Sequence, residues 1–137
     1  MAIKQPALYV GHGAPLLLDD PIWSAELEKW AKRLARPTAI LIVSAHWESA
    51  PLALSSVDNG TPLIYDFGGF DPKFYNLQYR APGAPELAAR IKAIFGESEI
   101  HQSNRGLDHG AYVPLMKMFP EAEINLVPVE RPTPILA

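Results

Sequence analysis

The feature that most constrains the fold is a pair of short apolar runs on either side of an amphipathic segment. The first run, residues 7–10, ends at Gly11-His12-Gly13, and the second, residues 39–43, ends at Ser44-Ala45-His46. Short apolar runs bounded by turn residues are typical of buried strands. We therefore expect two buried strands, each followed directly by a loop that carries a histidine.

The segment between these runs predicts an amphipathic helix. Its large apolar residues recur at spacings of three and four positions, with charged residues between them: Trp23, Leu27, Trp30 and Leu34. Asp20 and Pro21 suit the cap and the first turn of this helix. A strand, a helix and a second strand form a β-α-β unit, which places two parallel strands in one sheet. The first two strands are therefore expected to lie near each other.

The rest of the chain continues the alternation of strands and helices. We expect further strands over residues 51–57, 99–102 and 124–129, helices over 85–95 and 108–119, and an ordered loop over 59–85. A length of 137 residues suits one domain spanning residues 1–137. The predicted fold class is α/β, with a mainly parallel central sheet flanked by helices.

Composition excludes several classes of function. The net charge is −3 and the 12 Lys and Arg residues are scattered, so nucleic acid is not expected as a partner. The chain has no cysteine, so metal chemistry must use imidazole or carboxylate ligands. The first apolar run is too short for a signal-peptide core or a membrane span. We therefore expect a cytoplasmic protein without a membrane partner.

Two histidines occupy equivalent positions after predicted strands. The carboxyl ends of parallel strands meet at one edge of a sheet, so His12 and His46 are expected there together. Neutral imidazole is a common ligand of zinc and iron. A histidine at a strand end can also simply hydrogen-bond to a neighbouring loop. Two of them in equivalent positions favour metal binding.

A third histidine lies where a loop meets a predicted helix. His109, between Asp108 and Gly110, is placed to exchange protons near neutral pH as an acid/base. The same spacing equally allows Asp108 to cap the helix while His109 has no chemical role. The fourth histidine, His101, lies in a predicted edge strand among polar residues, so we assign it to the surface.

The aromatic loop offers candidates for substrate binding. Asp66, Phe67 and Tyr75 could line a pocket for an aromatic substrate, since planar rings stack and phenols form hydrogen bonds. The alternative is that these residues, with Tyr79, only hold the loop against the domain.

Several blocks together resemble one family. The blocks are Gly11-His12-Gly13-Ala14-Pro15, Ser44-Ala45-His46-Trp47, Tyr65-Asp66-Phe67-Gly68-Gly69-Phe70, Ala81-Pro82-Gly83 and Leu107-Asp108-His109-Gly110. In kind and order they resemble the class III extradiol ring-cleavage dioxygenases, in the DOPA 4,5-dioxygenase-like branch, over nearly the whole chain.

This resemblance implies a site and a reaction. It makes His12 and His46 ligands of one Fe(II) or Zn(II) ion per site, and His109 the acid/base that deprotonates the substrate. The implied partners are a catechol-type aromatic molecule and O₂. Members of the family continue beyond the length of this chain, and their later half supplies a third ligand and a further histidine. The chain is therefore expected to be truncated relative to the family.

Three functions follow as alternatives. The first is an extradiol catechol dioxygenase, the second a zinc-dependent hydrolase, and the third a metal-binding remnant without turnover. In a truncated sheet, the strand over residues 124–129 would lack neighbours and form an exposed apolar edge. Such an edge pairs readily with another chain, so we predict a homo-oligomer.

Overall fold

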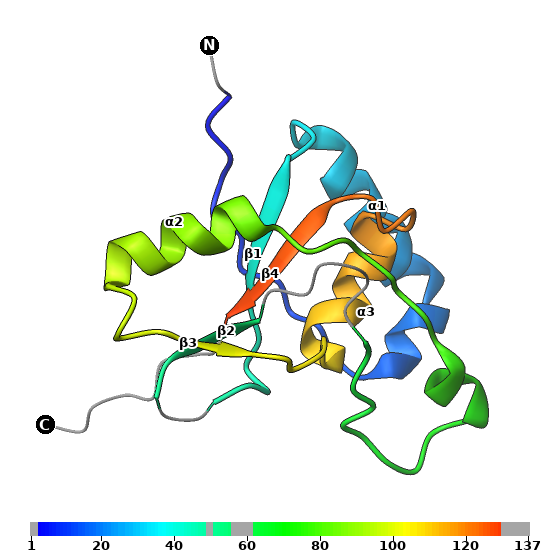
Figure 1. Ribbon diagram of the computed structural model, residues 1–137. Coiled ribbons are helices and arrows are strands. Elements are labelled where there is room, and N and C mark those ends of the chain that lie inside the picture. The colour runs from blue at the N-terminus through cyan, green and yellow to red at the C-terminus, as the bar shows by residue number, and fades with distance from the viewer. Residues whose placement is uncertain (1–2, 49–50, 56–61, 130–137) are drawn as a thin grey trace, which may run out of the picture.

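The computed structural model describes residues 3–48, 51–55 and 62–129. Its elements in chain order are η1 Pro15–Asp19, α1 Pro21–Arg33, β1 Ala39–Val43, β2 Ala53–Ser55, η2 Pro72–Asn76, α2 Pro85–Phe95, β3 His101–Ser103, α3 His109–Met118 and β4 Asn125–Val129. In the described ranges the strands form a four-stranded sheet with helices around it (Figure 1). This arrangement confirms the predicted α/β class.

The order of strands in the sheet is β1-β4-β2-β3. β1 pairs with β4 in parallel, and β2 pairs with β3 in parallel. One antiparallel contact, between Leu54 and Val129, joins the two pairs. The sheet is thus mainly parallel, as expected, but mixed at its centre.

The prediction that residues 124–129 form an exposed edge is wrong. β4 lies between β1 and β2, and Leu126 and Val127 are fully buried. The continuous apolar run of β4 reflects burial on both faces, which is usual for a central strand. The expected homo-oligomer therefore has no support from this strand.

The strand expected over residues 7–10 is also absent from the structure. This segment belongs to no strand, and Tyr9 is 97% exposed. The parallel partner of β1 is β4, which comes from the far end of the described chain and pairs from Ala39↔Asn125 to Val43↔Val129. An apolar run forms a strand only where it finds a hydrogen-bonding partner, and among the described residues this segment finds none in the sheet.

The helices follow the sequence closely. The side chain of Asp20 accepts hydrogen bonds from the backbone N–H groups of Ile22 and Trp23, each at 2.9 Å, so it caps α1 as predicted. α2 ends at Phe95 with Gly96 as its C-cap, and α3 begins at His109. Of the expected strand over residues 51–57, Ala53–Ser55 form β2, residues 51 and 52 are outside it, and residues 56 and 57 lie outside the described residues.

Successive residues of β4 point to opposite faces of the sheet and pack into two separate hydrophobic cores. Leu126 packs in a cluster with Tyr112 and Val113 of α3, whereas Val127 packs with Ile91 of α2. Figure 1 shows α2 on one side of the sheet and α1 with α3 on the other. No helix in the described part of the chain is long and apolar enough to cross a membrane. The sheet and α3 together position the site.

Candidate metal centre

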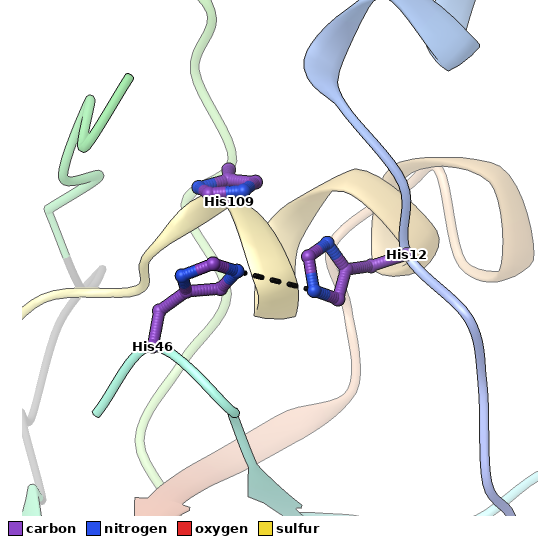
Figure 2. Close-up of side chains that lie close together, drawn as sticks. All are labelled: His12, His46 and His109. Carbon is purple, nitrogen blue, oxygen red and sulfur yellow. Dashed lines mark hydrogen bonds between the residues drawn. The ribbon is translucent and has the colours of Figure 1, made fainter. Parts of the chain in front are cut away.

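Three histidines from distant parts of the sequence meet at one place. His12 lies before η1, His46 follows β1, and His109 is the first residue of α3. One ring nitrogen from each lies within 4.8 Å of the others, and Figure 2 shows the three rings facing a common point. The structure therefore brings together the three histidines that the sequence singled out.

The spacing of these nitrogens fits one metal ion. The Nε2 atoms of His12 and His46 are 3.2 Å apart. Two imidazoles bound at about 2.0–2.1 Å, at angles of roughly 90–110°, place their nitrogens about 3.0–3.4 Å apart. His12 directs Nδ1 to the carbonyl of Gly13 at 2.7 Å, so that its Nε2 is left for a ligand. The imidazole donor set therefore suits Fe(II) or Zn(II).

A glycine makes the turn that carries His12. Gly13 has φ of +56°, in the left-handed region that favours glycine. A Cβ atom at this position would lie 2.1 Å from Cδ1 of Leu17 in η1. The positive φ favours glycine here, so the Gly-His-Gly block places the His12 ring by its backbone conformation.

A tight turn carries His46. The backbone N–H of Trp47 donates to the carbonyl of Ser44 at 3.2 Å, and the N–H of His46 donates to Oγ of Ser44 at 3.2 Å. Oγ of Ser44 in turn donates to Oδ1 of Asp108 at 2.5 Å. The turn is thereby tied to the residue that directly precedes α3.

Asp108 holds the N-cap position of α3, but its side chain binds elsewhere. It is 2% exposed, and its side chain makes no capping hydrogen bond to α3. Its Oδ2 lies 3.4 Å from Nη2 of Arg105, which also donates to the carbonyl of His46 at 3.2 Å. The side-chain cap that the alternative account requires is therefore not formed, although Asp108 holds the N-cap position. Its carboxylate instead fixes the His46 turn through Ser44 and Arg105.

His109 is the most buried of the three, at 8% exposure, and it bonds to Asp66. Oδ1 of Asp66 lies 2.7 Å from Nδ1 of His109 and accepts the backbone N–H of His109 at 3.2 Å. Burial alone would raise the pKa of Asp66, but the hydrogen bonds and charge of His109 outweigh it and lower that pKa. Asp66 is therefore a carboxylate at neutral pH.

The electrostatics of the cluster favour a neutral His46. Burial lowers the pKa of His46, and the like charges of His109 and His12 lower it further. These effects outweigh the opposing influence of Asp66 and Asp108. Near neutral pH the ring therefore keeps a lone pair available for a metal.

The aromatic loop lies beside this cluster. The ring of Phe67 meets that of His109 edge to face, with centroids 5.8 Å apart, and the ring of Tyr75 is 5.0 Å from that of Phe67. Tyr79 is buried and donates to the carbonyl of Phe119 at 2.7 Å, so it holds the loop. His101 is exposed on β3 and is not part of the cluster, as predicted.

Two members of the site were missed at the level of sequence. Ser44 and Arg105 each join segments that are far apart in the chain, through the bonds from Ser44 to Asp108 and from Arg105 to the carbonyl of His46, so their spacing carried no signal. Ser44 did stand inside the block Ser44-Ala45-His46-Trp47, and its position beside a candidate ligand was the one available hint.

Comparison with known proteins gives one consistent result. The family described as "Catalytic LigB subunit of aromatic ring-opening dioxygenase" matches residues 12–135. A 4,5-DOPA dioxygenase extradiol of Beta vulgaris is 46% identical over 125 residues, covering 85% of this chain and 46% of the relative. One of Escherichia coli K12 is 37% identical, covering 90% and 46%. The chain thus spans about half the length of the curated relatives it matches.

A solved structure shares the fold. The crystal structure of an uncharacterized protein from Escherichia coli K12 superposes with a TM-score of 0.62 at 29% identity. The match covers 79% of this chain and 39% of that chain.

Proposed function

Because this chain belongs to the family of the catalytic LigB subunit of aromatic ring-opening dioxygenases, we propose that it is an extradiol ring-cleavage dioxygenase acting on a catechol with O₂. The observation that carries the proposal is the convergence of His12, His46 and His109 beside an aromatic loop. Relatives named as 4,5-DOPA dioxygenases give the same substrate class. The substrate is therefore proposed as a catechol-type aromatic molecule.

His12 and His46 are the proposed ligands of one metal ion. Their Nε2 atoms are 3.2 Å apart, the separation expected for two ligands of one ion. When bound, the metal supplies Lewis acidity toward the catechol oxygens and open positions for O₂. Fe(II) suits this role better than Zn(II), which has no redox chemistry.

His109 is the proposed acid/base. Its Nδ1 is engaged with Asp66, so Nε2 is the nitrogen that can take a proton from a substrate hydroxyl and return it later. Its burial keeps bulk water away from this exchange. An imidazole suits the task because its ordinary pKa lies near neutral pH.

Phe67 and Tyr75 are the proposed substrate contacts. Their rings form a wall next to His109, against which an aromatic ring can stack. The hydroxyl of Tyr75 reaches the carbonyl of Phe67 at 3.4 Å, which orients the wall. A direct contact of Asp66 with substrate stays a prediction from the sequence.

The test combines metal content with oxygen uptake in single variants. After anaerobic loading with Fe(II), the purified protein should hold about one iron per chain, take up O₂ with a catechol and form a yellow product. His46→Ala should lose iron and activity, whereas His109→Ala should keep iron and lose activity. His101→Ala is the matched control, since His101 is exposed and outside the cluster.

Each outcome has a definite meaning. Iron retained in full by His46→Ala would refute the ligand assignment. Iron lost from His109→Ala as completely as from His46→Ala would make His109 a ligand and not the acid/base. Metal without O₂ uptake would favour the inactive remnant, and ester or amide hydrolysis with zinc would favour the hydrolase.

The cellular location and the oligomeric state stay predictions. A cytoplasmic protein should appear in the cytosolic fraction after cell lysis. The predicted homo-oligomer would be refuted by a strictly monomeric mass in solution at micromolar concentration.

A further inference from the structure

Asp66 serves two groups of His109 with one oxygen. Oδ1 lies 2.7 Å from the ring Nδ1 and accepts the backbone N–H at 3.2 Å. That backbone N–H belongs to the first turn of α3, where no intrahelical partner exists. A carboxylate at a helix N-terminus is also favoured by the helix dipole. Asp66, from a loop 43 positions earlier in the chain, thus fixes both the ring and the backbone of His109.

The same pattern recurs around the cluster. His12 turns Nδ1 to the carbonyl of Gly13 at 2.7 Å. Nδ1 of His46 lies 3.9 Å from Oδ2 of Asp66, which is beyond hydrogen-bond length. In His12 and His109 Nδ1 therefore lies at hydrogen-bond distance from an oxygen, and the Nε2 atoms of His12 and His46 face each other.

We propose that Asp66 is a positioning residue that holds His109 in the Nδ1–H tautomer and so presents the lone pair of Nε2 to the other two histidines. A neutral imidazole carries its proton on one nitrogen only. In the other tautomer, the lone pair of Nδ1 would lie 2.7 Å from a carboxylate oxygen, with no proton between them. A charge-assisted hydrogen bond in a mostly buried pair strongly favours the first tautomer.

This role of Asp66 deepens the proposed function, and it rests on that function only where the Nε2 lone pair of His109 takes a proton from the substrate. Oδ1 of Asp66 is thereby assigned to His109. The side chains of His109 and Asp66 are 10% and 23% exposed, so water competes little for their bond. Outer partners of this kind typically change activity or metal affinity by about 10–100-fold when removed.

The direct test is the tautomer itself, measured by long-range ¹H–¹⁵N correlation on the metal-free protein. We expect Nδ1 of His109 to have the chemical shift of a protonated ring nitrogen and Nε2 that of an unprotonated one. Asp66→Ala should give averaged shifts from a mixture of tautomers. Asp66→Asn should restore most of the native pattern, because its amide oxygen can still accept the proton.

A matched control separates the effect of Asp66 on the His109 ring from the general effect of losing a helix cap. The side chain of Asp71 accepts the backbone N–H of Lys73 at 2.9 Å at the start of η2, so Asp71→Ala removes a comparable cap. It should leave the His109 nitrogen shifts unchanged. In the catechol assay, kcat should fall by about 10–100-fold in Asp66→Ala and much less in Asp66→Asn, with little change in KM.

Two results would overturn the inference: a native spectrum with the proton on Nε2, or His109 shifts unchanged in Asp66→Ala. Neither result depends on metal or turnover. A protein without dioxygenase activity whose tautomer still responds to Asp66→Ala would refute the proposed function and leave this inference standing. If the protein has dioxygenase activity but the His109 tautomer does not change in Asp66→Ala, the proposed function stands and this inference is refuted.

Discussion

Replacing Gly110 by alanine should damage the site more than the fold. Gly110 is the second residue of α3 and lies against the His46 turn. A Cβ atom there would lie 2.5 Å from Oγ of Ser44, 2.9 Å from Cδ2 of His46 and 3.1 Å from Oδ1 of Asp108. Ordinary contact begins near 3.4 Å, so Ser44 must move by roughly 0.9 Å and His46 by about 0.5 Å.

Two opposing effects set the size of the change in stability. Alanine is favoured over glycine in a helix by up to about 1 kcal/mol. Overpacking a tight contact costs about 1–3 kcal/mol. The free energy of unfolding should therefore fall by about 0–2 kcal/mol. Metal affinity should fall more clearly, because about 1.4 kcal/mol of strain at the His46 ring corresponds to a tenfold rise in Kd.

The assay is a metal titration together with urea denaturation of the metal-free protein. Gly68→Ala is the matched control, because a Cβ atom at Gly68 meets nothing within 4 Å. We expect a Kd at least about tenfold higher in Gly110→Ala and an unchanged Kd in Gly68→Ala. A Gly110→Ala protein with the native Kd and a higher free energy of unfolding would refute the close packing of α3 on the His46 turn.

Three further predictions follow from the described contacts. Asp108→Ala removes the acceptor of the Ser44 hydroxyl and should lower the free energy of unfolding by about 1.5–3 kcal/mol, with a smaller loss in Asp108→Asn; an unchanged urea midpoint would contradict this. Asp20→Ala should cost about 0.5–2 kcal/mol through the lost α1 cap and leave the metal Kd unaltered, and Asp20→Ser should recover most of the loss. The pKa of His46 is lowered from 6.5, so the unfolded state binds the proton more readily. The metal-free protein should therefore be destabilised as pH falls through 6.5 and below, and His46→Ala should flatten this part of the urea-midpoint profile; an equal slope in both proteins would remove His46 as the cause.

Local signals in the sequence predicted the helices and the positions of the candidate ligands. The cap at Asp20 and the apolar spacing of α1 depend on residues two to four positions apart, which lie close together at the start or on one face of any helix. β1 was equally clear, because an apolar run that ends at Ser44 is a local pattern. A histidine that directly follows such a run is therefore recognisable as a candidate ligand from the residues around it.

The order of the strands in the sheet could not be predicted from local signals in the sequence. The runs over residues 7–10 and 124–129 look alike in composition, yet the first is exposed and the second forms the centre of the sheet as β4. Strand pairing depends on which apolar faces the helices can cover, and here α2 and α3 cover the two faces of β4. No window of a few residues contains that information.

The sequence alone showed which side chains are available for chemistry: histidines that follow apolar runs or precede a helix, and no cysteine. The tertiary structure alone decided how they are held. The bond from Asp66 to His109 spans 43 positions and that from Ser44 to Asp108 spans 64. Such bonds form only after the sheet and α3 have packed, because packing of distant segments, and not local spacing, brings a carboxylate within hydrogen-bond distance of its partner.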